Sequence, residues 1–169
     1  MIYPIVKFGD PVLEKPAAPI TVFDDELRAL VEDMFESMYA AHGVGLAAPQ
    51  IGISKRVAVI DVTFKEDPEA KIVLVNPEII HTEGRLTSNE GCLSLPEFRE
   101  KVTRPSKVTA RAQNAEGKTF EVSGEELLAR ALVHETDHLN GKLYFNHISA
   151  LKRDMMKRKI RKLVKAGEW

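Results

Sequence analysis

The sequence predicts one α+β domain spanning residues 1–169, with mostly antiparallel sheets around a central helix and a helix at the C-terminus. β-Branched segments mark the strands, apolar residues at helical spacing mark the helices, and the two kinds do not alternate as regular βαβ units. A chain of 169 residues suits one domain, and no repeat or linker divides it. We expect residues 1–148 to form the core and residues 149–169 a basic C-terminal helix.

The N-terminal third contains one expected helix between irregular segments. Residues 1–23 are rich in proline and short apolar groups, which indicates an irregular arm or an edge strand. Asp24 or Asp25 can cap a helix that ends near Ala41, because apolar side chains recur at helical spacing after them. Glycines and Pro49 then end the helical pattern.

The middle of the chain is expected to form strands. They are the β-branched segments Arg56–Val62 and Ile72–Ile80, and a hairpin of Val102–Ala112 with Thr119–Val122 around Asn114–Gly117. Residues 84–98 hold glycines and a proline, and we expect them to form a functional loop with a short extended piece.

Two helices are expected in the last third of the chain. Ser123 followed by Glu126 has the spacing of a capping box, which predicts a helix from about Gly124 to Leu139. Asn140–Gly141 supplies the stop signal for that helix. A last helix is expected over Ala150–Lys165.

Composition and charge narrow the class of protein. The single cysteine rules out an internal disulfide and fits a reducing compartment. The start of the chain lacks the features of a secretory signal, and no apolar run approaches the roughly 20 residues of a membrane span. A formal net charge of -1 neither requires nor excludes a nucleic-acid partner. We expect a cytoplasmic protein that binds neither DNA nor membrane.

The helix expected at residues 124–139 carries the clearest chemical pattern. His134 and His138 are four residues apart, so on a helix they share one face and can chelate one divalent cation. Glu135 lies beside the first histidine, where a carboxylate can take a proton from water at the metal. The alternative is an amphipathic helix with two surface histidines. The capped helical context favours the metal motif, which the central helix of the fold would then bear.

Cys92 is the candidate third ligand. A catalytic zinc-type site needs three protein ligands and an open position. The cysteine lies in the glycine-containing segment Glu90–Ser94, and thiolate is a favoured ligand for zinc and ferrous iron. A lone cysteine is otherwise commonly a small buried hydrophobe. Its combination with the two histidines favours a role as a ligand.

A glycine-rich segment, Gly43–Gln50, is the third feature. Its glycines permit close backbone approach, and Gln50 offers an amide donor for a developing oxyanion. The segment lacks the Gly-Lys-Ser/Thr ending of a phosphate-binding loop. An ordinary turn from helix to strand is the alternative interpretation.

Together and in this order, Gly43–Gln50, Glu90–Ser94 and His134–His138 resemble three motifs of the peptide deformylase family. The similarity covers essentially the whole chain, from the Asp10–Leu13 start to a Leu143–Tyr144 strand after the metal helix. The resemblance implies a bacterial-type, metal-dependent hydrolase. Such an enzyme removes the N-formyl group from the N-terminal formylmethionine of nascent polypeptides and releases formate.

The resemblance also implies roles for individual residues. The implied metal ligands are Cys92, His134 and His138, with Fe(II) as the native metal and zinc, nickel or cobalt as replacements. Glu135 would act as general base and acid. The Gln50 side chain and the Leu93 backbone N–H would stabilise the oxyanion. The residues that would border the methionine pocket and pair with the peptide backbone are Val44, Gly45, Leu127, Ala131 and His134.

Some positions depart from the family pattern. Val133 stands where glutamine commonly precedes the first histidine, and Asn146 stands where aspartate is common. Neither is a ligand or the base, so these departures bear only on local hydrogen bonding around the site. The histidines that match no ligand position, interpreted as solvated or structural, are His42, His81 and His147.

The C-terminal segment 151–169 carries eight basic side chains against Asp154 and Glu168. The apolar residues expected to anchor one side of its helix are Leu151, Met155, Ile160, Leu163 and Val164. One interpretation is a solvated helix that covers the core. The other, implied by the resemblance, is docking to ribosomal RNA near the exit tunnel.

Three other functions share part of this pattern. A zinc endopeptidase shares the two-histidine motif and would cleave internal bonds without needing an N-formyl group. A cysteine hydrolase would use Cys92 with His134 and need no metal. A purely structural metal would leave no exchangeable water at the site. The three motifs together favour the deformylase.

Overall fold

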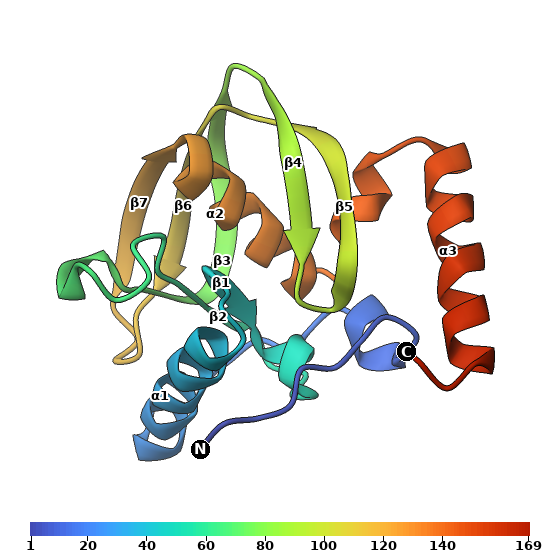
Figure 1. Ribbon diagram of the computed structural model, residues 1–169. Helices are drawn as coiled ribbons and strands as arrows, with labels where there is room; N and C mark the ends of the chain where they lie inside the picture. Colours follow the sequence, from blue (N-terminus) through green and yellow to red (C-terminus); the bar gives the residue numbers. More distant parts are fainter.

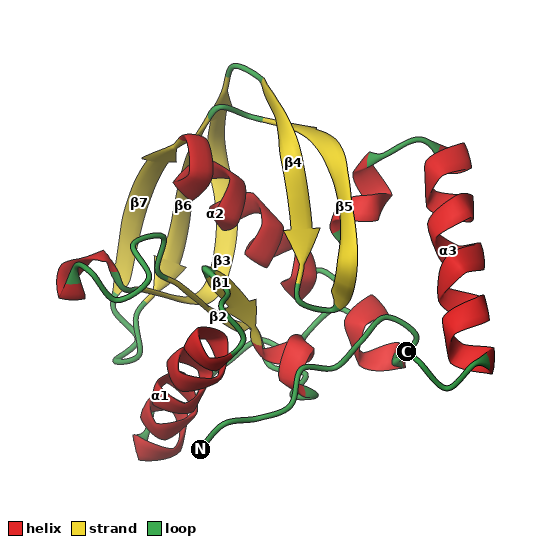
Figure 2. Ribbon diagram, viewed as in Figure 1, coloured by secondary structure: helices red, strands yellow, loops and turns green.

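A helix near the centre of the molecule, α2 (Glu126–Leu139), lies between two β-sheets (Figures 1 and 2). The strands are β1 (Gly45–Ala47), β2 (Val57–Ile60), β3 (Ile72–Glu83), β4 (Leu86–Cys92), β5 (Leu95–Arg104), β6 (Lys107–Gln113) and β7 (Thr119–Glu125). The computed structural model describes residues 1–169. Its five-stranded antiparallel sheet has the order β1-β2-β3-β6-β7, and β4 pairs with β5 in a second sheet. The predicted α+β class is confirmed.

The other two helices flank this assembly. They are α1 (Asp25–Ala40) and α3 (Ala150–Lys165), and both lie within a residue of the expected ranges. Asp24 caps α1 by accepting the Leu27 N–H at 3.0 Å. The buried face of α1 packs with β1 and β2, including Leu27, Met34 and Met38. That packing supports β1, which lies within the glycine-rich segment Gly43–Gln50.

β2 is the most deeply buried strand of the large sheet. All four of its residues, Val57–Ile60, are fully buried between α1 and α2, and it pairs with β1 on one side and β3 on the other. The strands expected at 56–62 and 72–80 are therefore present. The expected strand at 119–122 is also present and continues to Glu125.

The segment 84–98 differs from the expected functional loop, because it forms most of a β-hairpin. β4 and β5 pair from Leu86 with Arg104 to Cys92 with Leu95. The strand expected at 102–112 is correspondingly broken at Pro105–Ser106, between β5 and β6. Glycine and polar residues of β4 conceal this hairpin in the sequence, because their strand conformation depends on pairing with β5.

Two local expectations near α2 were wrong. Ser123 is not a helix cap, because it lies in β7 opposite Thr109, and their hydroxyl oxygens are 2.7 Å apart. The residue before α2 is Glu125, whose side chain makes no capping hydrogen bond. The segment expected as a Leu143–Tyr144 strand instead enters a 3-10 turn over Tyr144–His147.

α3 packs against the body through a narrower face than the sequence indicated. Met156 and Ile160 are buried, in a cluster that also contains Leu95 and Phe145. Leu151, Met155 and Val164, expected to anchor the helix, are instead 72%, 51% and 57% exposed. After α3, the Trp169 Nε1–H donates to the Phe8 carbonyl at 2.8 Å and ties the chain end to the N-terminal arm.

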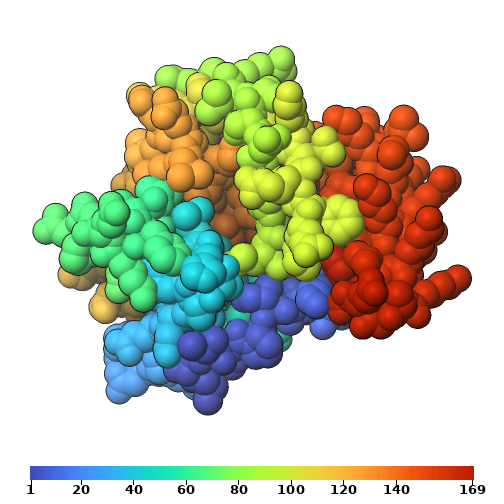
Figure 3. Space-filling view, viewed as in Figure 1, coloured from blue at the N-terminus to red at the C-terminus, as the bar shows by residue number.

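The surface leaves part of α2 accessible. In Figure 3, orange atoms of α2 remain visible between the yellow-green β4–β5 hairpin and the blue segment near β1. None of the helices is both long and apolar enough to cross a membrane. The exposed part of α2 faces a cleft that also borders β4 and β1.

Candidate metal centre

The three predicted ligands meet where the end of β4 crosses α2. The helix places His134 and His138 one turn apart, with their Nε2 atoms separated by 3.1 Å. Cys92, the last residue of β4, places its Sγ 3.3 Å from the His138 Nε2. All three ligand atoms lie within 4.8 Å of one another.

These separations fit a tetrahedral metal ion. Metal–nitrogen distances of about 2.0–2.1 Å and a metal–sulfur distance of about 2.3 Å set ligand atoms about 3.3–3.6 Å apart. The observed separations, 3.1 Å between the two imidazole nitrogens and 3.3 Å between Cys92 Sγ and His138 Nε2, are close to these values. Two imidazoles and one thiolate would occupy three tetrahedral positions and leave the fourth open. The donor set suits zinc or ferrous iron. The residues present therefore fit a catalytic metal site.

The two imidazoles have different charge environments. Burial, with the neighbouring His134, lowers the pKa of His138 well below its ordinary value. Burial also opposes a charge on His134, but Glu135, Cys92 and Glu90 together raise its pKa well above the ordinary value. A neutral imidazole with a free lone pair is the form that binds a metal, and His138 is held in it.

Glu90 orients the first histidine of the site. Its Oε2 lies 2.7 Å from the His134 Nδ1, which directs the opposite ring nitrogen toward Cys92 and His138. Arg104 donates to both carboxylate oxygens, at 3.1 and 2.7 Å. Burial opposes the charge of Glu90, but the hydrogen bonds from His134 and Arg104 hold its pKa well below the usual range. This carboxylate was not singled out in the sequence.

Arg104 extends the network to the far side of α2. Its Nη1 donates to Asp137 Oδ2 at 2.9 Å, and the His147 Nε2 lies 2.8 Å from the same oxygen. His147 was interpreted from the sequence as solvated or structural, and this contact gives it a structural role. The network links β4, β5 and the end of α2, so the ligands rest on three mutually braced elements.

Glu135 is buried beside the metal residues without a hydrogen-bond partner for its Oε1. Burial raises the pKa of its carboxyl group from 4.5 to about 7. A carboxyl group with this pKa can both accept and release a proton near neutral pH. Gly45 gives it room, because a Cβ on that glycine would overlap the Glu135 Oε2.

Gln50 presents an amide donor to the same site. Its Oε1 accepts the Ala47 backbone N–H at 3.0 Å, which fixes the amide so that the NH₂ group faces the other way. The Nε2 then lies 3.6 Å from the Cys92 Sγ and 3.3 Å from the Ser94 Oγ. Leu93 lies in the turn between β4 and β5, and its N–H donates no backbone hydrogen bond there.

A cleft of about 480 Å³ opens onto these groups. The predicted site residues that line it are Val44, Gly45, Gln50, Cys92, Leu93, Leu127, His134 and Glu135. Ala131 does not line the cleft, since it is buried in the core cluster between α2 and the large sheet. Arg99 and Arg130 also line it, and no motif in the sequence marks them.

The edge of β1 faces this cleft. The Val44 carbonyl accepts the Asp61 N–H at 2.8 Å and therefore points toward β2. Backbone groups of successive strand residues point to opposite edges, so those of Gly45 point toward the open edge. β1 is the terminal strand of its sheet, which leaves this edge available to an extended peptide.

Comparison with known proteins agrees with this geometry. The family model described as "Polypeptide deformylase" matches residues 2–154. A peptide deformylase of Acidobacterium capsulatum is 67% identical over 169 residues, covering 100% of this chain and 99% of the relative. One from Cellvibrio japonicus is 47% identical over 167 residues and covers 98% of each chain.

Solved structures show the same similarity. The crystal structure of a peptide deformylase from Legionella pneumophila has a TM-score of 0.91 and 47% identity, covering 99% of this chain and 98% of that one. A peptide deformylase from Thermus thermophilus has a TM-score of 0.88 and 40% identity, covering 97% and 96%. The cleft, the three converging ligands and these similarities lead to one assignment: the chain belongs to the polypeptide deformylase family.

Proposed function

We propose that Cys92, His134, His138 and Glu135 form the active site with which this chain performs the reaction of its family. That reaction removes the N-formyl group from the N-terminal methionine of nascent polypeptides and releases formate. The observation that carries the assignment is the convergence of three metal-binding atoms beside a buried carboxyl group. The core and the C-terminal helix share a buried cluster, which supports one catalytic domain over residues 1–169.

Three residues would hold one divalent cation. A cation held there by Cys92, His134 and His138 supplies Lewis-acid chemistry, which acidifies water and polarises a carbonyl group. We propose Fe(II) as the native ion, because thiolate and imidazole suit it, with zinc, nickel or cobalt as replacements. Metal analysis of anaerobically purified protein tests this identity.

Glu135 would move the proton in both halves of the reaction. As a carboxylate it takes a proton from the attacking water, and as a carboxylic acid it gives that proton to the departing amine. In the metal-free protein, burial raises the pKa of this carboxyl group to about 7, close to the pH at which both forms are populated. Glu135 is buried next to His134 and close to Gly45, at the wall of the cleft.

Gln50 and Leu93 would stabilise the negative charge that develops on the formyl oxygen. The Gln50 NH₂ group is already oriented toward the site by the Ala47 N–H, so it does not have to reorganise during the reaction. The Leu93 N–H is free to donate from the turn beside Cys92. Leu93 lies in the turn after β4, and Gln50 lies in the segment after β1.

The peptide would bind as an added strand along β1. The outward-facing backbone groups of Gly45 can pair with it, while Val44 and Leu127 border its first side chain. Ala131, which the resemblance placed at this pocket, is buried in the core cluster and would not touch the peptide. A formyl group is small, which agrees with the close approach of Gly45 to Glu135.

A formate-release assay tests this function. We expect metal-loaded protein to hydrolyse formyl-Met-Ala-Ser and to leave acetyl-Met-Ala-Ser intact. Cleavage of internal peptide bonds instead would support the endopeptidase. Full activity after metal removal by a chelator would support the hydrolase that uses Cys92 as a nucleophile.

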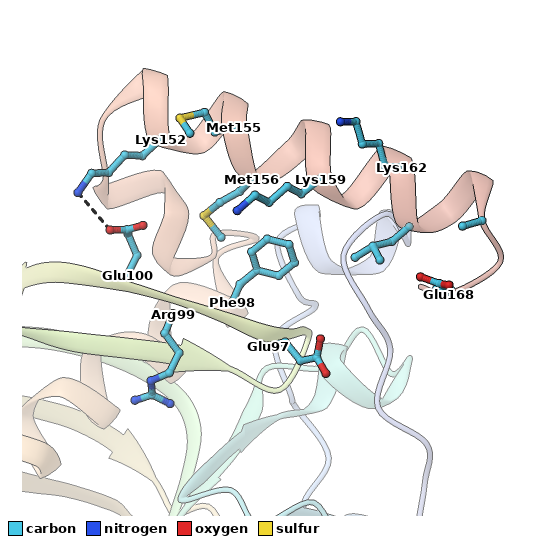
Figure 4. Close-up of a pocket in the computed structure, with 12 residues that line it drawn as sticks. Glu97, Phe98, Arg99, Glu100, Lys152, Met155, Met156, Lys159, Lys162 and Glu168 are labelled. Carbon is cyan, nitrogen blue, oxygen red and sulfur yellow. Dashed lines mark hydrogen bonds and ion pairs between the residues drawn. The ribbon is translucent and has the colours of Figure 1, made fainter.

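We further propose that α3 contacts ribosomal RNA, with the reaction taking place in the cytoplasm, where nascent chains are made. Of its basic side chains only Lys152 forms an ion pair, with Glu100 at 3.1 Å. Lys162 points away from β5 in Figure 4, so its charge is available to a phosphate backbone. The apolar wall of the groove beneath, including Phe98 and Met156, holds the helix on the body.

Ribosome cosedimentation at increasing salt tests the RNA contact. Because Met156 and Ile160 belong to the core, substitution of surface charges is a cleaner change than deletion of the helix. We expect Lys159→Gln combined with Lys162→Gln to reduce binding and its dependence on salt. Glu32→Gln with Glu36→Gln, on the remote α1, is the control. Equal binding by both double variants contradicts the contact.

A further inference from the structure

Arg130 is a buried cation in the wall of the cleft for which the hydrolytic chemistry has no use. It is 7% exposed and lines the same cleft as Glu135 and Gln50. A buried charge is costly unless it is paired and hydrogen-bonded. The side chain therefore needs a structural or functional reason for its place.

The guanidinium group is clamped between two fixed acceptors. Its Nη1 donates to Glu90 Oε1 at 2.7 Å, and its Nη2 donates to the Leu86 carbonyl of β4 at 2.9 Å. Glu90 does not depend on this contact for its orientation, since Arg104 already donates to both of its oxygens. Holding Glu90 is therefore not the distinctive contribution of Arg130.

The distinctive feature is where Arg130 lies on the helix. Leu127, Arg130 and His134 follow one another at spacings of three and four residues, so they share the face of α2 that borders the cleft. This face runs from the metal ligand to an apolar residue with the arginine between them. The Arg130 Nε–H donates to no group of the protein. Arg130 therefore offers the cleft the apolar methylene groups of its side chain and one free hydrogen-bond donor.

We propose that Arg130 determines which first side chain the peptide pocket accepts. An unbranched chain lies along the arginine stem, beside Leu127, and a hydrogen-bond acceptor near its end receives the guanidinium N–H. The methionine thioether is a weak acceptor of this kind, and the oxygen of methionine sulfoxide is a stronger one. The pocket thus takes formylated methionine in both its reduced and its oxidised form. This inference rests on the proposed deformylase site.

Three formyl peptides that differ only in the first side chain test the proposal: formyl-Met-Ala-Ser, its norleucine analogue and its methionine sulfoxide analogue. The measured quantity is the ratio of kcat/KM for the sulfoxide to kcat/KM for norleucine. A site built to donate a hydrogen bond loses discrimination when the donor is removed. We expect Arg130→Met to lower this ratio by about tenfold or more.

Two further variants complete the experiment. Arg130→Lys retains the charge but lacks the fork that pairs Glu90 and Leu86, and we expect a ratio between those of wild type and Arg130→Met. Arg111→Met, at an exposed arginine on β6, is the matched control and should leave the ratio unchanged. Melting temperature and metal content show whether each variant is folded and loaded.

The outcomes separate the two proposals. An unchanged ratio in folded, metal-loaded Arg130→Met overturns the role of Arg130, and if that variant does not fold, an unchanged ratio in Arg130→Lys does so. Wild-type protein that releases no formate from any of the three peptides overturns the proposed function instead.

Discussion

The Oε2 of Glu90 lies 2.7 Å from the Nδ1 of His134, so a carboxylate buried between two arginines orients a proposed metal ligand. This contact sets which ring nitrogen faces the other two ligands. We therefore expect metal affinity to depend on Glu90, which is not one of the proposed ligands.

Glu90→Gln is therefore expected to weaken metal binding. The amide removes the negative charge that pairs with Arg104 and Arg130 and holds the histidine less firmly. Loss of such a partner typically costs about 10–100-fold in metal affinity. Competition with a chromophoric chelator measures the effect. Glu83→Gln, at an exposed glutamate, is the control, and equal affinities of the two variants would contradict the role of Glu90.

Gly45→Ala is expected to impair catalysis while leaving the fold intact. The new methyl group would overlap the Glu135 Oε2 and displace the carboxyl group. A displacement of about 1 Å at a reacting group can cost on the order of a hundredfold in rate. Formate release gives kcat, and circular dichroism reports the fold.

Gly91→Ala is the matched control for that substitution. Its Cβ would meet only the flexible end of Arg99, at 3.0 Å, so the side chain can move aside. We expect kcat to remain within a few-fold of wild type, because a change in the rotamer of the Arg99 side chain costs little energy. A similar loss of kcat in both variants would argue against a specific effect on Glu135.

Asp61 is expected to make stability fall in acid. Burial alone would raise its pKa, but hydrogen bonds from Tyr39, Thr63 and the Lys65 N–H lower it from 3.8 to about 2. A folded-state pKa below the unfolded value stabilises the protein above pH 3.8, and this contribution is lost as the pH falls toward 2. The shift corresponds to about 2 kcal/mol of unfolding free energy at neutral pH.

Denaturant unfolding at several pH values tests this contribution. We expect Asp61→Asn to be less stable than wild type at neutral pH, with the difference shrinking between pH 3.8 and about 2. Asp154→Asn, at an exposed position on α3, should show neither effect. A difference between Asp61→Asn and wild type that does not change with pH would refute the linkage.

Local signals in the sequence were enough to predict the helices and the metal motif. α1 has its cap at Asp24 and a regular apolar spacing, and α3 has a comparable amphipathic pattern. The spacing of His134 and His138 defines a shared helix face without any tertiary information. Cys92 followed from the need for a third ligand, and the structure brings it to within 3.3 Å of His138.

What escaped prediction depends on contacts outside the local sequence pattern. β4 carries glycine and polar residues, and only its partner β5 makes it a strand. Glu90 meets Arg104 and Arg130 across 14 and 40 residues of chain, so no short motif contains the network. Ser123 had the spacing of a cap, but pairing with Thr109 across the sheet outweighed that local preference.

Formate release from formyl-Met-Ala-Ser by metal-loaded Glu135→Gln, measured beside wild type of equal metal content, tests the role of Glu135. Glutamine keeps the shape of Glu135 but cannot shuttle a proton, so we expect metal binding to persist and kcat to fall by about 10²–10⁴-fold. Wild-type kcat in the metal-loaded variant would contradict the assignment of Glu135, beside Cys92, His134 and His138, as the general base and acid.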